Sequence, residues 1–287
     1  MKERYYKVAE HVFMLKADAK EELLQELSQY EPFQTEPADE VTFCLEIVDE
    51  LSVTNIQEDM RQEDEGQTIV AGHTEDGVSY FEFWLGKKLC SIMIADKDYR
   101  QAKVCVKQNW SFGVNNAIMV MYALATANSQ TALFHSSVVS YQDRAYMFLG
   151  HSGTGKSTHS SLWLKYIEGT ELVNDDNPVV RIIDGVAHVY GSPWSGKTPC
   201  YRNVSYPVGS IVKLDQAPHN EIQRLKGIKA YAAVMPSISG KRWDKRLADG
   251  LHETVNLLAQ LVPIWHLDCL PDEGAAHLCC QNCAHGS

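Results

Sequence analysis

One short segment of the chain combines glycines, a lysine and hydroxyl groups at a spacing that suits phosphate chemistry. Residues 150–157 read GHSGTGKS and fit the pattern G-x-x-x-x-G-K-[ST] at every fixed position. Glycines let such a loop turn tightly with its backbone N–H groups pointing inward, and a following helix adds its positive N-terminal end. The segment therefore predicts a phosphate-binding loop, called the P-loop below, that binds a nucleotide.

The side chains of the P-loop have distinct expected roles. Lys156 can reach the β- and γ-phosphates, and the Ser157 hydroxyl can ligate Mg²⁺. We expect ATP and Mg²⁺ as cofactors, although the sequence does not exclude another phosphoryl donor such as pyrophosphate. The residues expected to contact the nucleotide are Gly150, Ser152, Gly153, Thr154, Gly155, Lys156, Ser157 and Thr158.

Two adjacent aspartates, Asp175 and Asp176, follow a short apolar stretch downstream of the P-loop. Neighbouring side chains of an extended chain point to opposite sides, so one carboxylate can hold Mg²⁺ while the other accepts a proton from a hydroxyl. An Asn-Asp-Asp-Asn run alone is typical of a solvated turn. It comes beside the P-loop if the strand before the loop and the strand before the aspartates are neighbours.

The elements that must position these residues can be read from the pattern around them. Residues 145–149 predict a strand that runs into the P-loop, and residues 157–166 predict a helix that leaves it. Residues 132–139 predict another strand, which must form an antiparallel hairpin with 145–149 because the polar turn between them is too short for a parallel crossover. His135 lies on this strand and comes near a transferred phosphate if the two strands abut; alone, it is more typical of a structural histidine.

The second part of the chain also contains a strong hairpin signal. Asp184-Gly185 separates two apolar runs, as in a two-residue hairpin turn. Hairpins mixed with a strand–loop–helix unit predict a mixed sheet in an α/β fold, unlike a purely parallel doubly wound sheet.

The first part of the chain shows no chemical constellation. Strand-like runs recur in it, a helix is expected over residues 20–30, and the acidic stretch 58–67 is expected to be a loop. A length of 287 residues suits two domains. We therefore expect a strand-rich accessory domain over residues 1–112, with a role in substrate selection, and a P-loop kinase-like domain over residues 113–287.

Composition excludes several classes of protein. The net charge of −11 argues against a dedicated nucleic-acid binder, because that work needs a basic surface. No apolar run is long enough for a membrane span. The N-terminal residues lack an export-signal core, and the eight cysteines are scattered, so we expect a cytoplasmic protein with reduced thiols.

Three segments together resemble the kinase core of HPr kinase/phosphorylase, whose fold is shared with phosphoenolpyruvate carboxykinase. The segments are residues 135–139 (HSSVV), 150–158 (GHSGTGKST) and 172–176 (LVNDD). The resemblance is clear over about residues 130–200, is loose over the rest of the C-terminal half, and does not extend to the first ~110 residues. It implies a kinase domain of this P-loop type and, since such kinases assemble, a homo-oligomer.

The resemblance also implies individual roles. The aspartate that matches Asp175 is the family's proposed base toward a serine hydroxyl. The groups that match Asp176 and Ser157 serve Mg²⁺, and the histidine that matches His135 lies close to the reacting phosphate. With Lys156, the implied catalytic residues are therefore Asp175, His135 and Lys156, and the implied metal ligands are Ser157 and Asp176.

Two positions depart from the family pattern. Thr158 stands where the family usually has glutamate, and Asn174 stands where it usually has alanine. No segment matches the part with which HPr kinase grips its protein substrate. The acceptor is therefore left open among a protein serine, a peptide serine and a small molecule.

Three weaker signals lie outside these segments. Lys197 closes a Gly-rich loop and could contact phosphate or substrate, while Trp194 in the same loop could equally be a core anchor. Arg242 follows a glycine and could clamp a phosphate. A C-terminal cluster has partial zinc-ligand spacing, without a second C-x-x-C pair: His277, Cys279, Cys280, Cys283 and His285.

Three functions fit these observations. The first is an ATP- and Mg-dependent kinase that transfers the γ-phosphoryl group to a hydroxyl. The second is a P-loop ATPase that couples hydrolysis to a conformational change, although the transporter signature LSGGQ and the guanine motif NKxD are absent. The third is a nucleotide-binding regulator without turnover, which the intact set of candidate catalytic residues disfavours.

Overall fold

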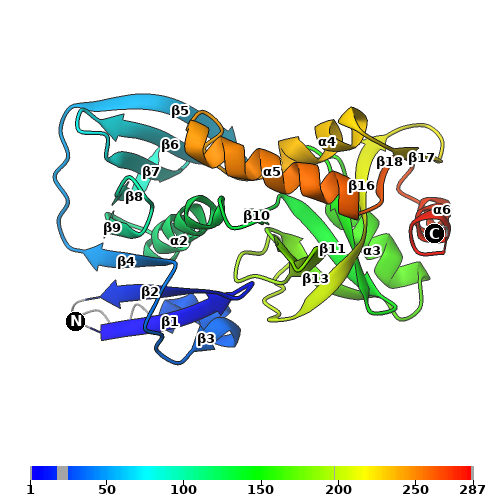
Figure 1. Cartoon of the computed structure of the whole chain (residues 1–287), viewed down its shortest axis with the longest axis horizontal. Helices are drawn as coiled ribbons and strands as arrows, with labels where there is room; N and C mark the ends of the chain where they lie inside the picture. Colours follow the sequence, from blue (N-terminus) through cyan, green and yellow to red (C-terminus); the bar gives the residue numbers. More distant parts are fainter. Residues whose placement is uncertain (1, 18–24, 197, 286–287) are drawn as a thin grey trace. The chain divides into compact units, whose positions relative to one another are not determined.

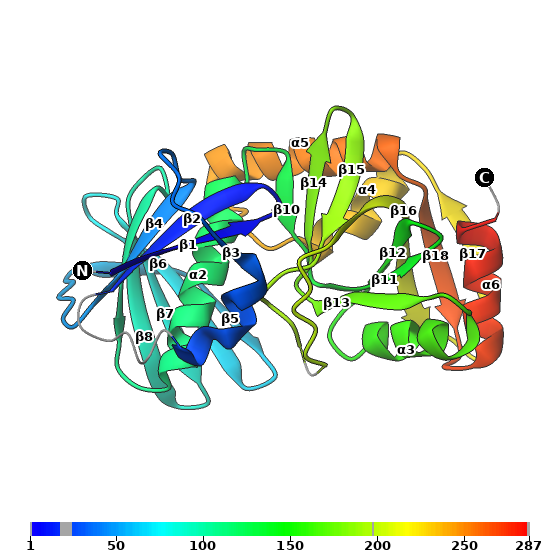
Figure 2. The same ribbon diagram turned by 90° about the horizontal axis from the view of Figure 1, so that it is seen from below.

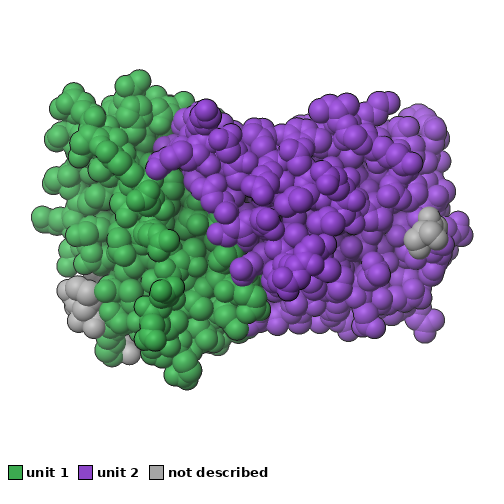
Figure 3. All heavy atoms as spheres, in the orientation of Figure 1, with its two compact units in different colours: residues 1–126 green, residues 127–287 purple. Residues whose placement is uncertain are grey.

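The computed structural model describes residues 2–17, 25–196 and 198–285. These residues fall into two compact units, Met1–Thr126 and Ala127–Ser287, called unit 1 and unit 2 (Figure 3). In the described residues each unit contains a nine-stranded sheet that mixes parallel and antiparallel pairs. The chain is therefore a mixed α/β protein with two large sheets.

Unit 1 is rich in strands, which lie in the order β3-β1-β2-β4-β9-β8-β7-β6-β5 (Figure 1). Helix α2 (Trp110–Thr126) packs against β4, β7, β8 and β9. Part of the helix expected over residues 20–30 lies outside the described residues, and the part from Gln25 belongs to the 3₁₀ helix η1 (Gln25–Phe33). The strands are β1 (Lys2–Val8), β2 (His11–Ala17), β3 (Gln34–Thr35), β4 (Phe43–Val48), β5 (Ile56–Asp64), β6 (Gln67–Thr74), β7 (Ser79–Leu85), β8 (Lys88–Ala95) and β9 (Gln101–Val106).

Helix α2 sets the division between the units. The sequence placed the division after residue 112, but α2 begins at Trp110 and the first unit extends to Thr126. Val114, Ala117 and Ile118 of this helix are fully buried. Because an apolar helix must cover a sheet or another helix, α2 belongs with the sheet on which it packs.

The prediction of a loop over the acidic stretch 58–67 is wrong. Most of it belongs to the antiparallel pair β5 and β6, which turns at Glu65-Gly66 with Gly66 at φ 80°. Strand β5 lies at the edge of the sheet with nearly all its side chains exposed. Because neither face of such a strand is buried, apolar and polar residues need not alternate along it. Its charged side chains also disfavour pairing with another chain. Its composition therefore does not look like that of a strand.

Unit 2 arranges its strands in the order β10-β14-β15-β16-β12-β11-β13, with β17 and β18 joined through β16. The hairpins predicted before the P-loop and at Asp184-Gly185 are confirmed as β11–β12 and β14–β15. The elements are β10 (Thr131–Leu133), β11 (Ser136–Tyr141), β12 (Arg144–Leu149), α3 (Lys156–Tyr166), β13 (Glu171–Asp176), β14 (Val179–Ile183), β15 (Val186–Tyr190), β16 (Ser205–Gln216), β17 (Glu221–Leu225), α4 (Ile228–Val234), η2 (Met235–Ser237), α5 (Lys245–Leu261), β18 (Ile264–Cys269) and α6 (Glu273–Cys283).

The prediction of one continuous strand over residues 132–139 is wrong, because the strand is interrupted at its middle. The chain forms β10, which pairs with β14, and then β11, which pairs with β12 and β13. Between them, the Phe134 N–H donates to the carbonyl of Pro178 at 3.0 Å and the His135 N–H donates to the carbonyl of Ser237 at 2.7 Å. These bonds replace strand pairing where the chain changes partners, so His135 lies at a break between strands.

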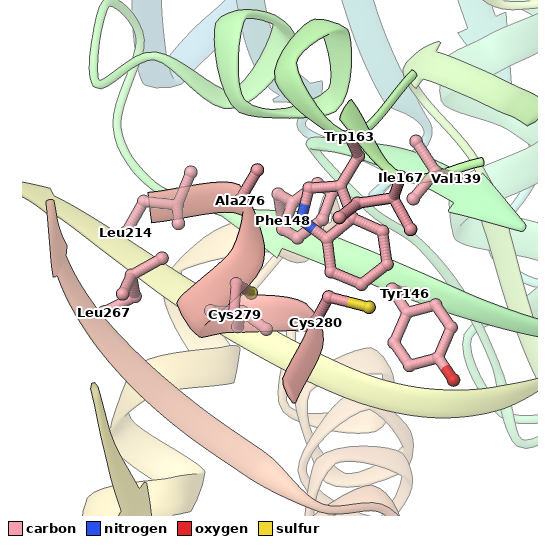
Figure 4. Packing of buried hydrophobic residues seen from close by; sticks show 11 residues of the cluster. Val139, Tyr146, Phe148, Trp163, Ile167, Leu214, Leu267, Ala276, Cys279 and Cys280 are labelled. Carbon is pink, nitrogen blue, oxygen red and sulfur yellow. The ribbon is translucent and has the colours of Figure 1, made fainter. Parts of the chain in front are cut away.

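Apolar side chains fill the space between the sheet of unit 2 and helices α3 and α6 (Figure 4). Trp163 of α3 packs on Tyr146 and Phe148 of β12, with ring centroids 5.1 and 5.6 Å apart. Burial raises the pKa of Tyr146 to about 12 and that of Cys279 in α6 well above its usual value, so both groups stay neutral. This packing anchors α3, the helix that continues from the P-loop.

Helices α4 and α5 contact the sheet on the side away from α3 (Figure 2). Their strand partners are β10, β15, β16 and β18. No helix in the described part of the chain is long and apolar enough to cross a membrane. The eight cysteines, all within the described ranges, are free thiols.

Candidate functional site

The backbone of the P-loop leaves β12 and leads directly into α3. Gly153 and Gly155 have φ angles of 81° and 108°, in a region that other residues rarely adopt. The backbone N–H groups of Ser152, Gly153 and Gly155 have no hydrogen-bond acceptor among the described residues. Unpaired N–H groups at a helix N-terminus suit an anion, because the helix dipole adds positive potential there.

The Lys156 side chain folds back over the P-loop. Its Nζ donates to the carbonyls of Gly150 and His151 at 3.1 and 3.3 Å, and the residue is 9% exposed. Ser157 and Thr158 are exposed in the first turn of α3. The loop thus gathers an ammonium group, hydroxyl groups and unpaired N–H groups in one place.

Helix α3 is tied to the sheet by one buried polar contact and by the His159 ring, which packs on Phe148 of β12 with ring centroids 4.7 Å apart. The hydroxyls of Ser137 in β11 and Ser160 in α3 lie 2.6 Å apart. His159 Nε2 accepts from the Trp163 indole N–H at 3.2 Å, and burial lowers the pKa of His159 to about 4. His159 is therefore neutral at physiological pH, which suits its role as the acceptor of a hydrogen bond within α3.

Strand order brings the two predicted parts of the site to one edge of the sheet. β11 lies between β12 and β13 and runs antiparallel to both. Ser136 at the start of β11 therefore pairs with Leu149 at the end of β12 and with Asp176 at the end of β13. The condition that the strand before the P-loop and the strand before the aspartates be neighbours is not met, because β11 lies between them. The two strands lie two strand spacings apart, about 10 Å.

Asp175 lies opposite Ser137 in the β11–β13 pair. Residues directly opposite share a face, and Ser137 contacts α3, so Asp175 lies on the α3 face of the sheet. Its side chain is buried, with 4% of the residue exposed, and its backbone carbonyl accepts from the Gly196 N–H at 2.6 Å. No side chain or N–H group in the described ranges donates to its carboxylate, so that group is available as an acceptor.

Asp176 adopts an unusual backbone conformation and contacts His135. Its φ angle is 140°, which is strained for a residue with a side chain. One carboxylate oxygen lies 3.4 Å from His135 Nε2, and the other accepts from Asn177 Nδ2 at 2.7 Å. The break before β11 and the strain at Asp176 thus bring together two side chains that lie far apart in the sequence.

The loop after β15 is held against the end of β13. The Ser192 hydroxyl donates to the carbonyl of Asn177 at 2.6 Å, and Asn174 Nδ2 donates to Ser192 Oγ and the Trp194 carbonyl at 3.2 and 3.1 Å. Trp194 is only 2% exposed, as expected of a core anchor, whereas Lys197 lies outside the described residues. Asn174 therefore holds this loop in place.

One residue at the P-loop was missed by the sequence analysis. Gln216, the last residue of β16, donates from Nε2 to the carbonyls of Gly153 and Thr154 at 3.2 and 3.3 Å. No local motif marks it, because its position follows only from the parallel pairing of β16 with β12.

A second polar cluster lies on β16 and β18, close to their carboxyl ends. Metal-binding atoms of Asp215, His266 and Asp268 lie within 4.8 Å of one another. Asp215 Oδ2 also lies 2.8 Å from the Lys213 ammonium and 2.7 Å from His266 Nε2. Partial burial opposes ionisation of Asp215, but these two hydrogen bonds lower its pKa overall. Because Lys213 already neutralises the carboxylate, the cluster is an ion-pair network that braces the end of β16.

Arg242, which the sequence singled out as a phosphate clamp, contacts backbone carbonyls. Its Nη2 donates to the backbone carbonyls of Met235, Pro236 and Ile238 at 2.9, 3.0 and 2.8 Å. The guanidinium group satisfies carbonyls at the end of a helix, where a positive charge is favourable. These contacts give Arg242 a structural role, and its role as a phosphate clamp stays a prediction.

The C-terminal cysteines and histidines do not converge on one point. Cys279 is fully buried, and its Sγ lies 3.9 Å from that of Cys283. His277 instead lies 3.4 Å from Glu273, one helical turn away. Among the described residues, no group of three metal-binding atoms gathers in α6.

The residues expected to hold Mg²⁺ offer suitable donor atoms. Mg²⁺ takes oxygen ligands and is usually bound by one or two carboxylates together with substrate phosphates and water. The Ser157 hydroxyl has no partner among the described residues, and Asp176 presents a carboxylate at the same edge of the sheet. The donor set therefore fits Mg²⁺.

Comparisons with known proteins give only distant similarity, and only to solved structures. No protein-family model matches the chain, and no curated protein matches its sequence. Among solved structures, the chain is similar to the Hpr(Ser) kinase/phosphatase from Coxiella burnetii, with 10% identity and a TM-score of 0.29 over 51% of this chain and 89% of that one. At this level of similarity, what the site does has to be inferred from its own residues.

Proposed function

We propose that the protein is an ATP- and Mg²⁺-dependent phosphotransferase that moves the γ-phosphoryl group of ATP to a hydroxyl. The observation that carries the proposal is the position of a buried carboxylate, Asp175, on the α3 face at the sheet edge where the P-loop begins. A phosphate-binding loop alone would serve any nucleotide-binding protein. A buried carboxylate beside it supplies the base that transfer to a hydroxyl uses.

The residues divide the reaction between them. The unpaired N–H groups of the P-loop and the Lys156 ammonium bind the β- and γ-phosphates. Asp175 accepts the proton of the acceptor hydroxyl while the hydroxyl oxygen forms the new bond to the γ-phosphorus. The bond from that phosphorus to the bridging oxygen of ADP breaks, and ADP leaves with the electron pair. Ser157 and Asp176 would hold Mg²⁺, which neutralises negative charge on the phosphates.

The segments 135–139, 150–158 and 172–176 support a relation to HPr kinase/phosphorylase in this proposal. The acceptor is accordingly a serine-type hydroxyl of a protein, a peptide or a small molecule. Unit 1, which carries none of these segments, is proposed to select the acceptor. A homo-oligomer is part of the same proposal.

The test is a transfer assay with the full chain. The protein is incubated with Mg-ATP and a panel of acceptors that includes free serine, serine peptides and small proteins, and ADP and phosphorylated product are both measured. We expect ADP to form only with an acceptor, in equal amounts with the phosphorylated product. ADP release at the same rate without any acceptor would show the ATPase alternative, and tight ATP binding without turnover would show the regulator.

A matched pair of lysine variants ties the activity to the P-loop. Lys156→Met should lower the transfer rate by about 100-fold or more, because it removes a charge from the transferring phosphoryl group. Lys103→Met in unit 1 removes an exposed lysine whose partner is Glu46, 3.5 Å away, and should leave transfer unchanged. Equal activity of the two variants would contradict the assignment of the site.

A further inference from the structure

Strand β16 extends past the end of β12 and runs alongside the P-loop. The two strands are parallel, with Leu149 level with Lys213. β12 ends at Leu149, whereas β16 continues to Gln216. A parallel strand rises about 3.3 Å per residue, so Gln216 lies about 10 Å beyond the end of β12. This extension brings its side chain to the middle of the loop.

The backbone of Gln216 is held firmly at this position. It pairs with Cys269 of β18, and the next residue, Ala217, donates its N–H to the Cys269 carbonyl at 3.2 Å. The ion-pair network of Lys213, Asp215 and His266 joins the same two strands one to three residues earlier. A side chain on a braced strand can hold a loop more accurately than a side chain on another loop.

The two hydrogen bonds from Gln216 set the direction of peptide groups in the P-loop. Its Nε2 draws the carbonyls of Gly153 and Thr154 toward β16. Because a peptide group is planar and trans, the N–H that follows a carbonyl points the opposite way. The carbonyl of Thr154 therefore turns the Gly155 N–H away from β16. That N–H is one of the three without an acceptor in the described structure.

We infer that Gln216 is a positioning residue of the nucleotide site, which holds the P-loop so that its N–H groups meet the phosphates. The inference rests on the proposed function, since it assumes that the loop binds phosphate. A carboxamide suits this task because it donates to two carbonyls without adding charge. A lysine or arginine would compete with Lys156 for the phosphate, and a carboxylate would repel it.

Three variants test the inference by binding. Gln216→Met keeps the size of the side chain but loses the hydrogen-bond donor. It should lower the affinity for ATP and for inorganic tripolyphosphate by about 10-fold, which is what the loss of two neutral hydrogen bonds would cost. Gln216→Glu adds a negative charge and should lower both affinities further. This additional loss of affinity should become smaller at high salt, which screens the charge. Gln62→Met is the matched control, because Gln62 is an exposed glutamine on the edge strand β5 of unit 1.

The ligand set distinguishes loop positioning from a general loss of structure. AMP lacks the β- and γ-phosphates, so any AMP binding should be equal in wild type and Gln216→Met. In the protein without ligand, amide hydrogen exchange over residues 150–157 should be faster in Gln216→Met than in Gln62→Met.

The results separate two failures. Unchanged tripolyphosphate affinity and unchanged exchange in Gln216→Met would overturn the role of Gln216 while leaving the proposed kinase intact. A wild-type protein that binds neither ATP nor tripolyphosphate would overturn the proposed function and the role of Gln216 with it. Equal weakening by Gln216→Met and Gln62→Met would also overturn the inference.

Discussion

Unit 1 and unit 2 are both built on large mixed sheets, but they bury different side chains. The core of unit 1 is largely aromatic and aliphatic, as in the stacked rings of Phe13 and Phe43, 4.9 Å apart. Both units bury a few polar side chains, but unit 2 also buries charged ones, among them Lys156 and Asp175 at one sheet edge. Burying charged and polar groups costs free energy unless partners compensate. The comparison therefore points to unit 2 as the part shaped by chemistry as well as by folding.

The largest expected difference between the units is in catalysis. Asp175→Asn should lower phosphoryl transfer by about 10²- to 10⁴-fold, because it removes the proton acceptor, and should leave the affinity for ATP within a few-fold of wild type. Asp64→Asn, on the exposed edge strand of unit 1, is the control and should change neither. Transfer and ATP titration are measured on the same samples. Near-normal transfer by Asp175→Asn would remove the chemical distinction between the units.

Large-to-small changes in the two cores should differ in their effect on the nucleotide. Phe83→Ala in β7 and Phe148→Ala in β12 each empty a fully buried position and should cost about 3–5 kcal/mol of unfolding free energy. Only Phe148 packs on Trp163 of α3, so only Phe148→Ala should also weaken ATP binding. Urea denaturation and ATP titration test this. Equal loss of ATP affinity in both variants would contradict it.

Acid should act on unit 2 through His159. Burial lowers its pKa from 6.5 to about 4, so below pH 6.5 the unfolded chain takes up a proton that the folded protein refuses until about pH 4. Stability is therefore complete above pH 6.5 and falls by up to about 3 kcal/mol as the pH drops to 4.

The difference between the unfolding free energies at pH 7 and pH 4.5 should be smaller in His159→Gln than in wild type. His73→Gln, at a partly exposed position in unit 1, serves as the control and should keep the wild-type difference. If the unfolding free energies of His159→Gln and wild type fall by the same amount between pH 7 and pH 4.5, the proposed role of His159 is wrong.

The smallest expected effect is the same in both units. Gly66 and Gly185 occupy hairpin turns at φ 80° and 78°, and an added Cβ would meet nothing within 4 Å at either position. Gly66→Ala and Gly185→Ala should each cost about 1 kcal/mol, from backbone strain alone. Thermal unfolding measures both, and a clearly larger loss at one turn would show that the units do not treat equivalent turns alike.

The fold was predictable where the signals are local. The mixed sheet of unit 2 and its two hairpins follow from apolar runs and turn residues that stand next to each other in the chain. The prediction failed at residues 58–67, where an exposed edge strand carries the composition of a loop. It also failed near His135, where the chain changes strand partners within two residues.

By itself, the sequence predicted the P-loop, because all its glycines, its lysine and its hydroxyls lie within eight consecutive residues between a strand and a helix. It also named His135, Asp175 and Asp176 as candidates, without showing that they meet. Only the tertiary structure decided that β11 lies between the strands of the P-loop and the aspartates, and that Gln216 reaches the loop from β16. Strand order and register depend on pairing between distant segments, which no local pattern encodes.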